Sequence, residues 1–534
     1  MEENRITKTE ETGGKPAVWE NAPFFLKIIV LFSAFYVFCL YDNIMGITYP
    51  LYTAGLLGLY LYFLKKENRE LKKSSIFYMA AIFLLGLSSF LTDNEMIVFF
   101  NNAAGFLLYA VLFVHNSYSD KKWSFLKYVA ALLEFALSVA ENVPAVFKTV
   151  RRLSAGKKKD GSAEKKESKV LYVVLGLLIA LLLLCFILPL LASADPVFGD
   201  LIDRIFNLIF IQIAVPENLI SILLMFCWGV LFFFALISAV QQRKIREEQK
   251  ELRCLEPVTA VTALSVIGAV YLLFCLIQIS YLFTGGLTLP SDYTYSGFAR
   301  EGFFQLLFVS ILNLALVLLS LELFRNSKAL KILLTFISGC TYIMMISSAC
   351  RMYLYIEAYG LTRLRVLVLA ALLAIAVILG GMIRNIYKKE FPLFRFSIAV
   401  ITIVYVLLSL SHMDALIAKY NIAQRGLDIT YENSYLMTLS ADAAGVYADA
   451  AAENVERTEL ADEMLQDYFE KIRGYEDLGV RKFNLSRYLG VQAAERYETL
   501  TAEEKQRNTK PGDTVKTAFP EFPMRFMGGH SRES

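Results

Sequence analysis

The sequence predicts an all-α, polytopic transmembrane helical bundle of about eleven spans with an external, mainly helical tail. The chain of 534 residues is 56% hydrophobic and only 19% charged, whereas soluble domains are about 25% charged. Many apolar runs reach the roughly 20 residues that cross a hydrocarbon core of about 30 Å. Runs such as Val170–Ala192 have no polar face, which argues against helices on a soluble core.

The transmembrane domain is predicted to cover residues 23–412. Its first apolar run follows a polar leader and has no A-x-A cleavage site, so it is expected to remain in the protein as a span. The predicted spans are Phe24–Leu40, Ile44–Leu64, Ile76–Leu91, Met96–His115, Val170–Ala192, Leu219–Val240, Val258–Phe283, Phe303–Phe324, Ile332–Ala349, Val366–Ile383 and Pro392–Leu410.

The predicted orientation rests on lysines and arginines of the loops, which favour the cytoplasmic side. With the N-terminus inside, 28 of them fall in the inner loops, at 65–75, 116–169, 241–256, 324–331 and 384–391. Five fall in the outer loops, namely Arg204, Arg300, Arg351, Arg363 and Arg365. The N-terminal tail, residues 1–22, is therefore predicted to be cytoplasmic. An odd number of spans then places the C-terminal tail outside.

The cytoplasmic region 124–169 is predicted to contain an amphipathic helix that lies on the inner leaflet. It resembles a further span, but Lys127, Glu134, Glu141 and Lys148 recur every seven residues. At about 100° per residue these side chains form one narrow polar stripe, which is typical of an interfacial helix. The basic linker that follows is expected to be a solvated loop attracted to lipid. It lacks interleaved aromatic residues, so no nucleic acid partner is expected.

The C-terminal tail, residues 413–534, differs from the rest in composition. It holds 21 acidic and 15 basic residues, a net charge of −6. Leu460, Met464, Tyr468 and Ile472 recur every four residues, which indicates an amphipathic helix. We therefore expect an acidic, extracytoplasmic and mainly helical tail.

Motifs for nucleotide or metal chemistry are absent from the sequence. It contains no GxxxxGK[ST], HExxH or GxSxG motif, and its three histidines are scattered. The seven cysteines form no CxxC pair and are interpreted as small buried hydrophobes. We therefore assign no catalytic, cofactor-binding or metal-binding residue and no cofactor, and a non-enzymatic protein is favoured.

Polar residues gather instead in three predicted outer segments, Ser193–Arg204, Ser291–Leu306 and Ser347–Arg365. As one helix, Ile332–Gly360 would be about 43 Å long, longer than the hydrocarbon core. The helix is therefore predicted to continue beyond the membrane and to end at Gly360.

Opposite charges at the edge of a low-dielectric region need partners, so the outer segments are predicted to form one ion-paired cap over a candidate site. Snorkelling arginines and an aromatic belt are the alternative explanation. The candidate cap residues are Asp195, Tyr295, Arg300, Glu301, Arg351, Tyr355, Glu357, Tyr359 and Arg363.

Several motifs carry a family resemblance: SADPVF, YTYSGFAREGFFQLLF, SSACRMYLYIEAYGLTRLR, MDALIAKYNIAQRGLDITYENSYLMTLSADA and FNLSRY. In this order they resemble a bacterial family of multipass membrane proteins called domain of unknown function 4173, whose sister is 4153. The resemblance covers roughly residues 170–490. It implies an integral membrane protein, often from Gram-positive bacteria, and brings no catalytic residues.

The leading functional prediction is a multipass protein of the bacterial plasma membrane with an envelope role. Its outer loops and tail would sense a signal, act as a scaffold, or bind an envelope protein or a lipid; its oligomeric state stays open. One alternative is a transporter or channel, although the intramembrane polar residues are few: Asn101, Asn102, Gln278, Asn313 and Glu322. Another is a transferase for lipid-linked substrates with Asp195, Glu301 or Glu357 as a base.

Overall fold

The computed structural model describes the chain in several stretches. These are residues 20–156, 217–245, 247, 253–284, 295–388, 391–426, 434–453 and 459–509, with short pieces between 187 and 204. Helices dominate them, and the only β-type pairing there is an isolated bridge between Leu255 and Phe324. The all-α class is therefore confirmed.

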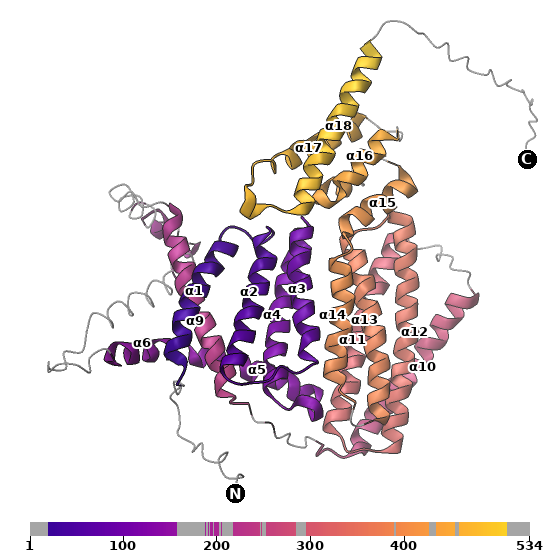
Figure 1. Cartoon of the computed structure of the whole chain (residues 1–534). Coiled ribbons are helices and arrows are strands. Elements are labelled where there is room, and N and C mark those ends of the chain that lie inside the picture. The colour runs from indigo at the N-terminus through magenta and orange to yellow at the C-terminus, as the bar shows by residue number, and fades with distance from the viewer. Residues whose placement is uncertain are drawn as a thin grey trace, which may run out of the picture.

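The first half of the bundle packs around one core of large apolar side chains. It consists of α1 (Ala22–Leu40), α2 (Thr48–Lys66), α3 (Ser75–Leu91), α4 (Glu95–Ser117) and α9 (Glu217–Gln242) (Figure 1). Aromatic rings fill this core in edge-to-face pairs, such as Tyr60 with Phe113 at 4.7 Å between centroids. Such pairs add about 1 kcal/mol beyond the area they bury.

The second half contains five further helices. These are α10 (Pro257–Thr284), α11 (Tyr295–Leu323), α12 (Lys328–Tyr359), α13 (Arg363–Tyr387) and α14 (Leu393–Ser409). α12 ends at Gly360, whose φ of 75° few other residues adopt, as the sequence predicts.

Polar side chains join the two halves inside the bundle. The Ser88 hydroxyl on α3 donates to the Ser409 carbonyl at the end of α14 (2.8 Å). The Asn101 amide oxygen on α4 accepts from Tyr405 (2.9 Å) and from Ser409 (2.7 Å). Small and polar residues of this kind hold membrane helices together, because the hydrophobic effect does not drive one helix onto another within lipid.

By length and composition, eight described helices can cross a membrane, or nine when the bent pair α14–α15 counts as one span. A polytopic helical membrane bundle is therefore confirmed, while the orientation stays a prediction. The predicted span Val170–Ala192 lies largely outside the described residues. α3 is too short to count as a span by length, and α2 is not among the eight, although both pack into the bundle. Residues Phe125–Leu153 are long and apolar enough to count as a span, although the sequence analysis places them on the membrane surface.

Two helices follow α4, namely α5 (Phe125–Asn142) and α6 (Ala145–Gly156). In Figure 1 α5 runs across the lower ends of the first-half helices rather than parallel to them. Its Tyr128 ring stacks on Phe394 of α14 at 4.1 Å, and Glu141 pairs with Lys244 after α9. The interfacial position of this helix and the leaflet on which it lies stay predictions.

The C-terminal segment forms a helical cap on the opposite end of the bundle (Figure 1). We use the name cap for α15 (Met413–Arg425), α16 (Ala444–Ala452), α17 (Glu459–Arg473), α18 (Leu485–Thr509) and the described residues that join them. Its own core includes Tyr447, Leu465 and Phe469. The predicted periodicity of α17 is confirmed, since Tyr468 and Ile472 are buried.

The chain enters the cap through a sharp turn. α14 and α15 meet at an angle of 62°, and His412 between them has a left-handed φ of 50°, which is uncommon for a residue other than glycine. The turn directs α15 away from the direction of the spans and over the end of the bundle.

Candidate functional site

The candidate site is the junction between the cap and three turns of the bundle. These turns connect α1 to α2, α3 to α4, and α12 to α13, and all three lie at the cap end (Figure 1). The first two belong to the first half and the third to the second half. The cap therefore contacts both halves.

Asp414, in the first turn of α15, is the centre of one buried network. Its carboxylate accepts two bonds from the Arg363 guanidinium, Nε to Oδ1 at 2.8 Å and Nη2 to Oδ2 at 2.6 Å. It also accepts from the Asn94 amide (2.9 Å) and from the backbone N–H (2.9 Å) and hydroxyl (2.7 Å) of Ser440. The Asp414 side chain is 0% exposed, so these donors replace water around a buried charge.

A second network joins the α3–α4 turn to α18. Arg487 Nε donates to Asp93 Oδ1 at 2.6 Å. Asp442 accepts from the Asp93 N–H (3.0 Å), from the Thr92 hydroxyl (2.5 Å) and from the Ser486 hydroxyl. Burial raises the pKa of Asp442 above its ordinary value, although these hydrogen bonds act in the opposite direction.

The segment before α18 attaches the cap to the α1–α2 turn. The Asn484 amide donates to the carbonyls of Met45 (2.9 Å) and Thr92 (3.0 Å), so it connects two turns of the first half. The Ile47 N–H donates to the Phe483 carbonyl at 2.8 Å. Lys482 pairs with Asp42 at 2.5 Å.

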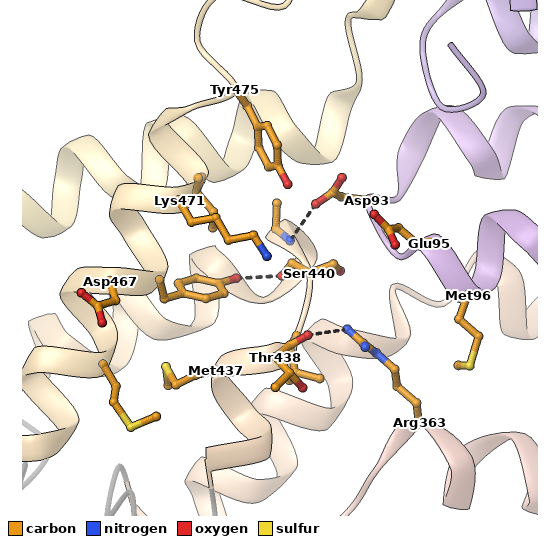
Figure 2. Close-up of a pocket in the computed structure, with 15 residues that line it drawn as sticks. Asp93, Glu95, Met96, Arg363, Met437, Thr438, Ser440, Asp467, Lys471 and Tyr475 are labelled. Carbon is orange, nitrogen blue, oxygen red and sulfur yellow. Dashed lines mark hydrogen bonds between the residues drawn. The ribbon is translucent and has the colours of Figure 1, made fainter. Parts of the chain in front are cut away.

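A pocket of about 500 Å³ lies beside these networks, between α17, the start of α4 and the start of α13 (Figure 2). Two carboxylates, Asp93 and Glu95, come from the bundle side, and Lys471 reaches across from α17. Arg363 and Met96 form part of the side nearest the spans. The pocket is therefore polar, with charges of both signs.

The nine outer-segment residues that the sequence analysis predicts to pair with one another do not form one cluster among the described residues. Arg363 belongs to the Asp414 network. Tyr355 and Tyr359 form an edge pair at 5.3 Å, and the Arg365 guanidinium lies 4.0 Å from the centre of the Tyr355 ring. Glu357 is exposed, and its backbone carbonyl accepts a hydrogen bond from Arg425 (3.2 Å).

The remaining predicted residues lie elsewhere. Arg351 packs its guanidinium against Gly302 of α11, which brings α12 beside the segment that carries Glu301. Asp195 is exposed and accepts a hydrogen bond from the nearby Val197 N–H (2.9 Å). The side chains of Tyr295, Arg300 and Glu301 lie outside the described residues, and so does their predicted pairing.

Sequence reasoning missed most residues of the junction, including Asp93, Asp414, Asp442, Asn484 and Arg487. A signal for them was present, because Asp414 and Asp442 lie in the MDALIAKYNIAQR…SADA motif and Asn484 and Arg487 lie in FNLSRY. Asp93, by contrast, occurs in an ordinary turn between two apolar runs. None of the described residues forms a group of His, Cys, Asp and Glu side chains suited to a metal ion.

The comparison with protein families decides where the chain belongs. The profile of the domain of unknown function DUF4153 matches residues 79–450, more than half of the chain. The chain belongs to the DUF4153 family. The DUF4153 match includes Asp93, Arg363, Asp414 and Asp442 and ends before α18. Neither a search of curated proteins nor a search of solved structures finds a match.

Proposed function

We propose that this integral membrane protein serves the bacterial envelope without catalysing a reaction. Its cap lies outside the cytoplasm at the plasma membrane and binds an envelope component, as a sensor or scaffold. The observation that supports this most is the docking of the cap on both halves of the bundle. A ligand at the junction would contact the α3–α4 turn, the α12–α13 turn and α17 together, and could change how they pack.

The contacts inside the bundle favour this function over transport. The intramembrane amides that could line a pathway are bonded between helices instead. Gln278 accepts from Ser347 (2.6 Å), and Asn313 accepts from Tyr271 (2.7 Å) and donates to Thr341 (3.0 Å). Such pairs act as packing contacts. We also propose that the chain is related to the sister family, domain of unknown function 4173, which its motifs resemble.

The side of the membrane on which the cap lies tests this proposal. Gln466 is exposed on α17, and the native Cys254 is exposed between α9 and α10 at the other end of the bundle. In intact cells a membrane-impermeant maleimide should label Gln466→Cys, whereas Cys254 should react only after permeabilisation. Labelling of Gln466→Cys only after permeabilisation would refute the envelope role.

The pocket carboxylate Glu95 separates a binding role from an enzymatic one. Glu95 is exposed at the pocket and makes no ion pair among the described residues. Replacing it by Gln should leave folding unchanged and alter only ligand binding. An enzyme that used Glu95 as a base would instead lose turnover while it kept ligand affinity.

A further inference from the structure

An apolar groove of about 230 Å³ lies on the surface of the bundle between α4, α13 and α14. Phe100 of α4, Ala371 of α13 and Ile401 of α14 line it, and all three are exposed. The groove lies within spans, so its surroundings are lipid acyl chains rather than water. Its alanines, Ala370, Ala371 and Ala374, leave space that larger side chains would fill.

The groove and the junction pocket lie in register along two helices. Met96 lines the pocket and Phe100 lines the groove on α4, and on α13 the corresponding residues are Arg363 and Leu367. A separation of four residues places each pair on one face of its helix, one turn apart. Leu408 of the groove also packs against the core of the cap. The apolar groove therefore begins where the polar pocket ends.

The depth of the groove suits an acyl chain. Leu367 and Ala374 are seven residues apart on α13, which corresponds to about 10 Å along the helix. One leaflet contributes about 15 Å, half of a hydrocarbon core of about 30 Å. A chain in the groove would therefore stay within one leaflet and would place its polar end at the pocket.

The pocket offers charges of both signs to such a polar end. Its Asp93 and Arg363 are already paired, with Arg487 and Asp414. Within the described part of the chain, Lys471, Glu95 and Asp467 of the pocket have neither an ion pair nor a side-chain hydrogen bond, and Figure 2 shows Asp467 at the outer edge, away from the centre. Figure 2 shows Lys471 reaching from α17 toward the centre and Glu95 on the opposite side. A cation and a carboxylate so placed complement a zwitterion.

We propose that groove and pocket together form one binding site for a zwitterionic phospholipid with an amine headgroup, such as phosphatidylethanolamine. One acyl chain lies between α4, α13 and α14, the phosphate faces Lys471, and the ammonium faces Glu95. The site needs a membrane-embedded bundle but not an extracytoplasmic cap. It therefore stands or fails separately from the envelope role.

Photocrosslinking tests the acyl-chain part. The full-length protein in nanodiscs would be irradiated with phosphatidylethanolamine that carries a diazirine in one acyl chain, and the labelled peptides mapped. We expect labels on the groove segments of α4, α13 and α14, and about tenfold less labelling there in Ala371→Trp, or about 1.4 kcal/mol of binding free energy. Ala269 is exposed on α10, so Ala269→Trp is the matched control. Equal labelling of the groove in Ala371→Trp and the control would overturn the proposal.

Competition between lipids tests the headgroup part, and its first comparison uses the wild-type protein. Unlabelled phosphatidylethanolamine should reduce the crosslink at concentrations about tenfold lower than phosphatidylglycerol, which has no amine. Glu95→Gln should remove this preference, because it removes the carboxylate that faces the ammonium, whereas Glu495→Gln, the same change at an exposed position of α18 away from the pocket, should keep it. Equal competition by the two lipids would overturn the headgroup assignment, as would equal effects of the two glutamate variants.

Discussion

Replacing Arg363 with alanine should weaken the docking of the cap by about 3 kcal/mol. Loss of one partner of a buried ion pair costs about 3–5 kcal/mol, because a charge stays buried without compensation. The Asp414 carboxylate is 0% exposed, but the Arg363 side chain is 23% exposed. Asp414 also keeps the donors of Asn94 and Ser440. Partial access of water and these remaining bonds place the expected cost at the lower end of the range.

Hydrogen–deuterium exchange in nanodiscs measures this cost where it arises. Backbone amides of residues 434–443 and of the α3–α4 turn exchange when the junction opens, so their rates report the free energy of local opening. A loss of about 3 kcal/mol corresponds to exchange that is about 150-fold faster.

The matched control is a second ion pair of the cap. Arg496 and Asp449 pair at 2.7 Å, but their side chains are 53% and 61% exposed. Solvent screens such a pair, so Arg496→Ala should change opening by less than about 1 kcal/mol. An Arg363→Ala variant whose exchange matches that of Arg496→Ala would refute the reasoning on the buried network.

Three further predictions concern the same junction. The pKa of Asp442 is raised by burial, so the folded protein holds this proton more strongly than the unfolded chain, and the contribution of Asp442 to stability falls as pH rises from about 4 through the raised pKa. The melting temperature of Asp442→Asn should therefore increase relative to that of wild type as pH rises. A decrease relative to wild type over the same pH range would contradict this. Asn484→Ala leaves the carbonyls of Met45 and Thr92 without this donor; a cost of about 1–3 kcal/mol should appear as faster exchange in the α1–α2 turn, with the α12–α13 turn unchanged as internal control. A Cβ at Gly46 would collide with the Arg481 carbonyl, whereas a Cβ at Gly58 on α2 meets nothing within 4 Å. Gly46→Ala should therefore expose the segment before α18 to protease and Gly58→Ala should not; equal cleavage of the two variants would count against this docking contact.

The helices of the bundle could be predicted because each depends on local sequence. Runs of apolar residues mark most of the predicted spans, and Gly360 marks the end of α12. The α17 helix could be predicted in the same way from its four-residue periodicity. Local patterns carry this information because a helix satisfies its backbone hydrogen bonds within its own segment.

The junction could not be predicted in the same way. Asp93 and Arg487 are separated by 394 positions, and Asn43 and Arg481 by 438. Nothing in the local sequence of either partner indicates the other. Arg363 was singled out because an arginine beside a span is conspicuous, whereas its partner Asp414 lies in an ordinary amphipathic helix. Charge counting therefore singles out Arg363 at the start of α13 and does not identify the segments that complete its network.

The account depends most on the docking of the cap onto the first half of the bundle. Cross-linking of the double variant Asp42→Cys/Lys482→Cys in native membranes tests this most directly, since the native side chains at these positions are in contact. The account predicts efficient cross-linking by a short bifunctional thiol reagent, and none in either single variant or in Asp42→Cys/Gln466→Cys. Failure of Asp42→Cys/Lys482→Cys to cross-link, in protein that is folded and inserted, would contradict a cap that joins the two halves.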